Sequence, residues 1–427
     1  MKIRKRYIVA EMVAIIAAIN TACSHNLYDE DKHEELVIKM QPVDTIDAYH
    51  NWQLAKSYTI TFDASKTNVG SKSIQILSAN PVAGHSANIL GQHHFTDGEK
   101  RTITFTAPTN ISEFYAALID ANEAYTIVQF TPDSRTVDFT NPIATKAIVN
   151  QRLLTLQSYC YCFEEEIPEP GDYDYNDIVL RISQERTAPK QITLNVTLAA
   201  VGTQRKIAAA IQLINFHYND IDSVVTKDGT TFDDGYVKTF PKMIEGEELL
   251  LQGFKGEALI NLFEDCHWAT KEAIMGPTGM LERHHYNVSK NTSTDLNFEI
   301  ISPRTISYII TFKDAASLDR FSLASIDPFI ITEYNGAFWE THANINRVGD
   351  QLLHRYTPST NMKILPWALT IPNSGFRYPL EGVNMGFYKK GILFGAYMTK
   401  GHSFGEWASN RRIAQDWYEY PTNNQVF

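Results

Sequence analysis

The sequence predicts a mainly β protein with two β-sandwich-like domains and few helices. From about residue 50 onward, short segments alternate apolar and polar side chains, and residues that favour turns stand between them. This period of two is typical of antiparallel strands with one buried face. The chain also contains 21 Tyr and 22 Phe, which suits the cores of two sandwiches. Helical spacing is clearest in two segments, residues 265–275 and 404–420.

The composition allows more than one hydrophobic core and argues against a nucleic-acid partner. Of the 427 residues, 44% are hydrophobic and 20% are charged, which is typical of a globular chain of two or three domains. The formal net charge is -11. Binding to nucleic-acid phosphates requires clustered Lys and Arg, and the sequence has no such cluster beyond its first residues. An acidic chain is better suited to cations or neutral sugars.

Residues 1–22 have the layout of an export signal, in which basic residues precede an apolar run and small residues follow it. The sequence "TAC" that ends at Cys23 resembles the bacterial lipobox, whose Cys is lipidated after cleavage. Asn20 and Glu11 depart from the usual pattern. We expect a lipoprotein signal peptide and lipidation of Cys23. Ordinary secretion and an uncleaved helix are the alternatives, although the apolar run is shorter than the ~20 residues that span a bilayer.

Residues 23–49 are predicted to form a tether between the membrane and the folded domains. The stretch "SHNLYDEDKHEE" is polar and acidic, as solvated linkers are. An acidic stretch after a lipidated Cys resembles the surface-export signal of Bacteroidetes lipoproteins. We therefore expect an outer-membrane lipoprotein of the cell envelope that is held by its lipid, and the leaflet stays open.

The strand pattern divides the folded part of the chain into two predicted domains. Residues 50–187 contain "YTITFD", "SIQIL", "TITFT", "FYAALI" and "YTIVQFT", and we expect an N-terminal β-sandwich that ends in an acidic loop. Residues 188–427 contain "QITLNVTLAAV", "RTISYIITF" and "FIITEYNGAFWE", in which Asn335-Gly336 favours a hairpin turn. The second domain is again predicted to be rich in β-strands.

The segment "GDYDYND" concentrates oxygen-bearing side chains just before a predicted strand. Asp172, Asp174 and Asn176 have the D-x-D-x-N spacing of the first half of an EF-hand loop, whose alternate side chains bind calcium. Asp177 stands where an EF-hand needs Gly, and the flanks are strands rather than helices. The acidic residues 164–166 could complete a ligand shell. The alternative is an acidic hairpin loop whose side chains bond only their own backbone.

The segment "CFEEEIPEPGDYDYNDIVLRI" resembles the FED…GDYDFNDVV segment of the LruC-domain family of bacterial surface and periplasmic proteins. Downstream, "ITLNVTLAAVGTQRKIAAAIQL", "LFEDCHWAT", "ILPWALTIPNSGFRYPLEGVNM" and "DWYEYP" resemble the C-terminal domain of the same family as found in Bacteroides lipoproteins. The resemblance covers about residues 155–421. It implies a β-rich exported protein with no established enzymatic activity.

The resemblance also implies a structural calcium ion at the acidic loop. Its ligands would be Asp172, Asp174, Asn176, Asp177 and Glu165, the last of which stands where the family has Asp. An all-oxygen ligand set argues against zinc, whereas other hard cations stay open.

The cysteines that remain after Cys23 do not predict a disulfide framework. Cys160 and Cys162 are two positions apart on a predicted strand, so they face the same way without the placement of an easy bridge. With Cys266 they make an odd number, so at least one thiol stays unpaired.

Enzyme motifs find little support. "GHSFG" at residues 401–405 fits the nucleophile elbow G-x-S-x-G, but no His follows His402 and no parallel α/β sheet is predicted. A pair of catalytic carboxylates can be chosen only by geometry, so a glycoside hydrolase stays an alternative. Exposed aromatic residues would favour a carbohydrate-binding component of a glycan-uptake system, for which Trp52, Trp339 and Tyr334 are candidates.

The sequence thus predicts a cell-envelope lipoprotein that acts as a non-catalytic, calcium-stabilised binding or adhesion module. Its expected partners are the membrane, through the lipid anchor, and a glycan or a protein at the cell surface.

Overall fold

The first sandwich of the computed structural model is built from nine strands of the N-terminal third. These are β1 Ala55–Asp63, β2 Ser71–Leu77, β3 Ala87–His94, β4 Lys100–Pro108, β5 Phe114–Asp120, β6 Ala124–Phe130, β7 Thr136–Asp138, β8 Ala144–Ile148 and β9 Leu154–Leu156. They form a three-stranded sheet of order β4-β1-β7 and a six-stranded sheet of order β8-β6-β5-β2-β3-β9. Both sheets contribute to one apolar core.

Strand β1 shows why the alternating pattern predicts this sandwich. Ile60 and Phe62 point into the core and are buried, whereas Thr59 and Thr61 lie on the outer face. There Thr61 Oγ1 is 2.9 Å from Oγ1 of Thr102 on β4, its partner in the antiparallel register. Cross-strand threonine pairs of this kind stabilise an exposed sheet face.

The described residues are 41–165, 171–234, 251–254, 256–272, 274–277, 279–291, 297–334, 337–344, 354–355, 365–389 and 392–427. The predicted signal peptide, Cys23 and most of the predicted tether lie outside them, as do Glu166 and the Asn335-Gly336 turn. No helix within these ranges is long and apolar enough to cross a membrane. Pro42–Phe427 form one compact unit that contains both sandwiches.

The second sandwich contains two larger sheets. Its strands are β10 Ser158–Phe163, β11 Ile178–Ala188, β12 Gln191–Val201, β13 Ala208–His217, β14 Ile221–Thr226, β15 Leu251–Phe254, β16 Glu257–Phe263, β19 His285–Tyr286, β20 Phe298–Glu299, β21 Arg304–Phe312, β22 Ile326–Tyr334, β23 Ala337–His342, β24 His354–Arg355 and β25 Ala368–Ile371. One sheet has the order β14-β21-β12-β11-β10-β25, with β19 and β20 beside it, and the other has the order β15-β16-β13-β22-β23-β24. Their facing sides share the largest apolar core. The protein is therefore mainly β and has several sheets, as predicted.

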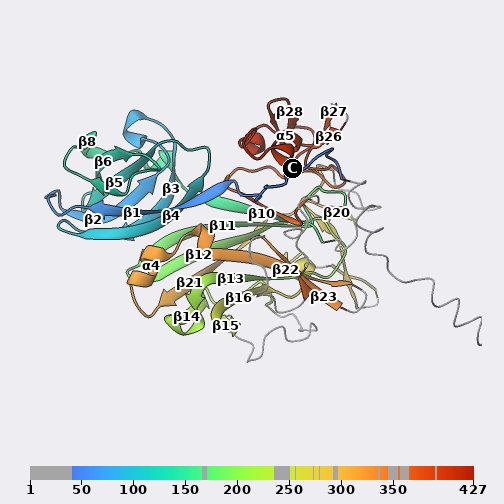
Figure 1. Cartoon of the computed structure of the whole chain (residues 1–427). Coiled ribbons are helices and arrows are strands. Elements are labelled where there is room, and N and C mark those ends of the chain that lie inside the picture. The colour runs from blue at the N-terminus through green and yellow to red at the C-terminus, as the bar shows by residue number, and fades with distance from the viewer. Residues whose placement is uncertain are drawn as a thin grey trace, which may run out of the picture. The chain divides into compact units, whose positions relative to one another are not determined.

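Strands β10 and β11 belong to the second sandwich, and this differs from the predicted boundary at residue 187. The two strands pair with each other from Phe163↔Ile178 to Ser158↔Ser183, and β11 continues the sheet to β12 (Figure 1). The acidic loop therefore connects two central strands of this sheet and does not end the first sandwich. Alternation along the chain indicates a strand, but it does not indicate which sheet the strand joins.

The C-terminal segment, residues 372–389 and 392–427 of the described chain, covers the outer face of the eight-stranded sheet. Side chains of β10, β11, β12 and β25 form a second large core there, together with the aromatic residues of the C-terminal segment, red in Figure 1. The elements of this segment are β26 Phe387–Lys389, β27 Ile392–Phe394, β28 Met398–Thr399, β29 His402–Ser403 and the helix α5 Phe404–Ser409. The remaining strands and α-helices are β17 Ile274–Met275, β18 Leu281–Glu282, α3 Cys266–Ala269 and α4 Ala316–Arg320.

Both predicted helices are present but much shorter than their patterns. Helix α3 ends at Ala269 because Lys271, two residues later, has a left-handed backbone with φ 62°, and residues 274–275 form β17. Helix α5 ends at Ser409, where Asn410 turns extended with φ -154°. The apolar residues beyond these ends had suggested a continuous helical face, but Met275 and Ile413 are exposed, and Trp417 is buried from a separate 3-10 turn, Trp417–Glu419.

Candidate metal centre

The acidic segment forms the connection between β10 and β11, and its backbone is unusual. Tyr173 and Tyr175 have φ values of 59° and 55°, a left-handed conformation that bulky residues rarely adopt. Each such residue costs on the order of 1–3 kcal/mol and persists only where its surroundings hold it. Both tyrosine rings are buried in the core beneath the C-terminal segment.

Two contacts hold the tyrosines in place. The hydroxyl of Tyr175 donates to the backbone carbonyl of Pro366 at 2.8 Å, and the carbonyl of Tyr173 accepts the backbone N–H of Met385 at 2.7 Å. In this loop, tyrosines held by contacts to the C-terminal part of the chain therefore alternate with acidic residues.

Three carboxylates converge at this loop. Glu164, Asp172 and Asp174 each offer an oxygen, and the three oxygens lie within 4.8 Å of one another. Hydrogen bonds from the backbone fix two of these side chains. Oε1 of Glu164 accepts the N–H of Tyr175 at 2.6 Å, and Oδ2 of Asp174 accepts the N–H of Gly382 at 2.9 Å. A carboxylate oxygen that accepts one hydrogen bond keeps a second lone pair for a cation.

The convergent group borders an acidic cavity of about 240 Å³. Its lining residues come from the acidic loop, from the chain after β12, from β19 and from the C-terminal segment: Glu164, Glu165, Asp172, Asp177, Gly202, Thr203, Gln204, Arg205, His285 and Glu381. Among these lining residues, the carboxylates outnumber the two basic side chains, Arg205 and His285. The cavity is thus electronegative and open to a cation.

Crowding and burial disfavour the charged form of the carboxylates. Burial, together with the charges of Asp172, Glu164 and Glu381, raises the pKa of Asp174 well above its ordinary value. Burial and the neighbouring acidic groups likewise raise the pKa of Asp177, and partial desolvation raises the pKa of Asp172, the exposed member of the convergent set. A bound cation would reverse this penalty, because opposite charge favours the ionised form.

Four of the five predicted ligands are acidic, and they fall into two groups. Asp172 and Asp174 belong to the convergent set. Asp177 and Glu165 line the cavity but are engaged elsewhere: Asp177 Oδ2 accepts the N–H of Glu165 at 2.8 Å, and Glu165 forms an ion pair with Arg205 at 3.1 Å. The second oxygen of Glu165 accepts a hydrogen bond from Thr203 at 2.8 Å.

Asn176 positions the loop and is not among the residues that line the cavity. Its Nδ2 donates to the carbonyl of Pro379 at 3.3 Å, and its backbone carbonyl accepts the N–H of Gly202 at 3.1 Å. A Cβ at Gly202 would lie 1.8 Å from Asn176 Oδ1, so the amide occupies the space that glycine leaves. The buried Oδ1 finds no hydrogen-bond donor in the described part of the chain.

Sequence reasoning gave no role to Glu381, and of the acidic residues 164–166 that could complete the shell it assigned Glu165 as the ligand. Glu381 lies far along the chain in "PLEGVN", and only the fold brings it to the cavity. The signal for Glu164 was present in the sequence, because it is the first acidic residue after the last apolar position of β10.

Two other sequence candidates have different roles. Ser403, in the predicted elbow, is fully buried and caps helix α5: its hydroxyl donates to Glu406 Oε2 at 2.7 Å and accepts the N–H of Glu406. Trp52, a candidate for sugar stacking, is buried and stacks on His50 at 3.8 Å, so the prediction that it forms an exposed platform is wrong. Trp339 is half-buried, and the side chain of Tyr334 is outside the described set.

The three described cysteines are free thiols. Cys160 and Cys162 face the same core, and their sulfur atoms are 3.8 Å apart. Cys266 is buried beside Asp265 and His267 at the start of α3.

The fold and this cavity define a multi-sheet β protein with an acidic pocket beside its central sheet. Residues 190–418 match the family described as "Domain of unknown function (DUF4842)", and this is more than half of the chain. The chain therefore belongs to the DUF4842 family. The matched part contains Gly202, Arg205 and Glu381, whereas the acidic loop precedes it. The resemblance to the LruC-domain family stays a prediction.

Among solved structures, the chain is similar to a crystal structure at 2.08 Å resolution of a "putative lipoprotein" from Bacteroides ovatus. The two chains are 13% identical, the similarity covers 84% of this chain and 99% of the other, and the TM-score is 0.48. No curated protein matches the chain.

Proposed function

We propose that this protein is a non-catalytic cell-envelope lipoprotein whose binding or adhesion module is stabilised by a calcium ion in the acidic cavity. The observation that carries the proposal is the convergence of Glu164, Asp172 and Asp174, whose oxygens lie within 4.8 Å of one another. The lipid anchor at Cys23 and the place in the outer membrane are supported by the pattern of the first residues.

The donor set fits calcium. Calcium binds six to eight oxygen atoms, takes carboxylates in one or two contacts, and tolerates irregular geometry. Glu164, Asp172 and Asp174 would hold the ion, and the cavity leaves room for water to complete its shell. Zinc is a poorer fit because this set contains neither nitrogen nor sulfur.

Calcium would act here as a structural charge. It would neutralise carboxylates that come from the β10–β11 loop and lie beside the C-terminal segment, whose Gly382 N–H already binds Asp174. The loop would then join the central sheet firmly to the layer that covers it. A ligand present at a hundredfold excess over its Kd stabilises the folded state by about 2.7 kcal/mol.

Thermal unfolding tests this role. We expect calcium to raise the unfolding midpoint of the EDTA-treated chain, because the folded state alone brings the three carboxylates together. Magnesium should have a smaller effect, since it demands near-ideal octahedral geometry. Equal midpoints in EDTA and in calcium would rule out the proposed stabilisation.

The calcium effect should also depend on pH. The folded state raises the pKa of Asp172, Asp174 and Asp177 above the ordinary value of 3.8. Below that value these carboxyl groups are protonated in the folded and in the unfolded state, so without calcium their contribution to the free energy of unfolding is fully present. It is lost as the pH rises through their raised folded pKa values. We expect the difference in midpoint between calcium and EDTA to be small near about pH 4 and to grow toward about pH 7. A constant difference across this range would contradict the assignment of the site to these carboxylates.

A further inference from the structure

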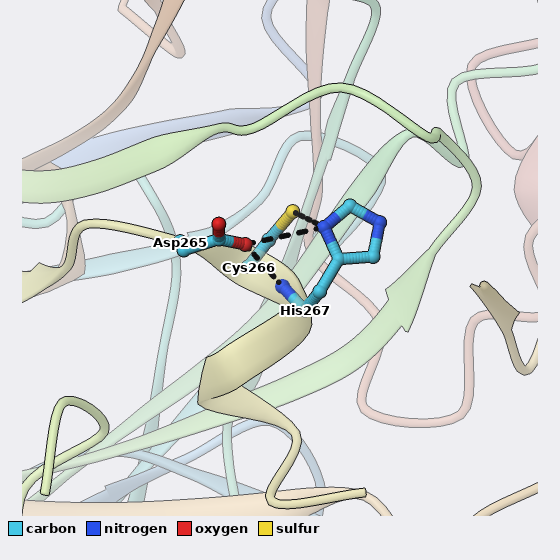
Figure 2. A group of neighbouring side chains, drawn as sticks. All are labelled: Asp265, Cys266 and His267. Carbon is cyan, nitrogen blue, oxygen red and sulfur yellow. Dashed lines mark hydrogen bonds and ion pairs between the residues drawn. The ribbon is translucent and has the colours of Figure 1, made fainter. Parts of the chain in front are cut away.

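A second cluster of metal-binding side chains lies at the start of helix α3. Asp265, Cys266 and His267 follow β16 directly, and all three side chains are buried, with exposures of 1%, 0% and 0%. One donor atom from each residue lies within 4.8 Å of the other two. Figure 2 shows the carboxylate, the sulfur and the ring nitrogen turned toward one another.

The spacing of these donors fits a tetrahedral metal shell. The Sγ of Cys266 is 3.3 Å from Nδ1 of His267, and Nδ1 is 3.2 Å from Oδ1 of Asp265 (Figure 2). Zinc binds nitrogen and oxygen at roughly 2.0–2.2 Å and sulfur at roughly 2.3 Å, so neighbouring ligands of a tetrahedral ion lie about 3.3–3.6 Å apart. The two observed separations, 3.3 Å and 3.2 Å, are close to these ligand-to-ligand distances.

The histidine has the orientation of a metal ligand. Its Nε2 is 2.8 Å from the backbone carbonyl of Thr203. Because a carbonyl only accepts, Nε2 carries the proton and donates it. This leaves Nδ1 as the atom that faces both the thiol and the carboxylate. Ligating histidines commonly donate their other ring N–H to a backbone carbonyl, which fixes the tautomer and the ring plane.

The rest of the surroundings leaves the three facing atoms for an ion. The other oxygen of Asp265, Oδ2, lies 3.8 Å from Arg283 Nη2. The carbonyl of Arg205 is 3.7 Å from Cys266 Sγ and could approach a fourth position, as could water. A divalent cation with one carboxylate and one thiolate forms a locally neutral group. Burying a neutral group costs less desolvation free energy than burying an uncompensated charge.

We propose that Asp265, Cys266 and His267 bind a divalent cation of the zinc class. The mixed set of sulfur, nitrogen and oxygen selects such a cation over calcium or magnesium. Binding replaces the thiol proton of Cys266, which passes to the solvent, and forms the metal–sulfur bond. The site differs from the proposed calcium site in its residues and ligand class, although both border residues 202–205: Thr203 binds His267 through its carbonyl and Glu165 through its hydroxyl.

Metal analysis of the refolded full-length chain tests the proposal. The chain is unfolded with a chelator and refolded with zinc or with cobalt, because the cluster is buried. We expect about one zinc per chain after dialysis, and with cobalt a thiolate-to-metal charge-transfer band in the near ultraviolet. Cys266→Ser should lose both the zinc and the band. Asp265→Asn keeps the oxygen that accepts the N–H of His267 at 3.0 Å, so it should fold and bind zinc more weakly.

The other thiols provide the matched control. The double variant Cys160→Ser, Cys162→Ser should keep the zinc and the cobalt band, because those sulfur atoms lie in a different core. Preserved far-ultraviolet circular dichroism of Cys266→Ser shows that the variant folds. A wild-type chain that refolds without bound zinc overturns the proposal and leaves a histidine–aspartate ion pair. Zinc that survives in Cys266→Ser overturns it as well. Neither result depends on whether calcium stabilises the protein.

Discussion

Gly202→Ala is expected to destabilise the protein by about 3 kcal/mol or more, an effect at the upper end for overpacking. The new Cβ would lie 1.8 Å from Oδ1 and 2.8 Å from the backbone carbonyl oxygen of Asn176. The side chain of Asn176 could rotate away from the new Cβ. Its backbone carbonyl accepts the N–H of Gly202, so the carbonyl can withdraw only if that hydrogen bond is lost. The acidic loop must therefore move. We expect a large decrease in the free energy of unfolding in urea and, in any folded fraction, loss of the calcium effect.

Gly375→Ala is the matched control for this substitution. Gly375 is exposed, its φ lies outside the left-handed region, and an added Cβ would approach only Asn373 Oδ1, at an ordinary 3.5 Å. Its effect should stay within about 0.5 kcal/mol. If Gly202→Ala were equally mild, the close contact between residue 202 and the acidic loop would not exist in the folded protein.

Trp417→Ala is expected to cost about 3–5 kcal/mol, as truncation of a buried tryptophan does. Trp417 is fully buried in the aromatic cluster through which the C-terminal segment packs on the sheet. Its ring centroid lies 4.9 Å from that of Tyr397 and 5.1 Å from that of Phe404. Phe404 in turn lies 6.4 Å from Tyr175 of the acidic loop. Loss of the indole should therefore loosen the loop and reduce the calcium effect as well as the free energy of unfolding.

Tyr420→Ala controls for removal of an aromatic ring from the same segment. Tyr420 is 39% exposed and stacks on His402 at 4.0 Å, away from the buried cluster. We expect a cost below about 1 kcal/mol. Similar effects for the two substitutions, measured by urea unfolding, would show that the cluster does not depend on Trp417.

The strands could be predicted from the sequence because their pattern is local. Residues 58–63, 102–106 and 304–312, for example, alternate by two and lie within β1, β4 and β21. Sheet membership could not be predicted, because the partners of β10 are β11 and the distant β25. Strands β10 and β11, which precede the boundary expected at residue 187, therefore pair within the second sandwich.

The site was predictable only in part, for the same reason. Asp172 and Asp174 are close in sequence, so their convergence follows from local geometry. Glu381 comes from the C-terminal segment, and no spacing rule connects it to the loop. Asn176 matches the ligand pattern, but in the fold its amide binds Pro379 and fills the space beside Gly202. A spacing motif identifies side chains that can turn to one side, whereas tertiary contacts decide which of them face the cavity.

The most direct measurement for the central claim is the calcium-induced shift in unfolding midpoint of Asp174→Asn, compared with the wild type and with Asp228→Asn. Asp174 is buried and belongs to the convergent set, whereas Asp228 is exposed and accepts a similar turn hydrogen bond from Thr230. We predict that Asp174→Asn loses the calcium shift while Asp228→Asn keeps it. A full calcium shift in Asp174→Asn would contradict a calcium site at this cavity.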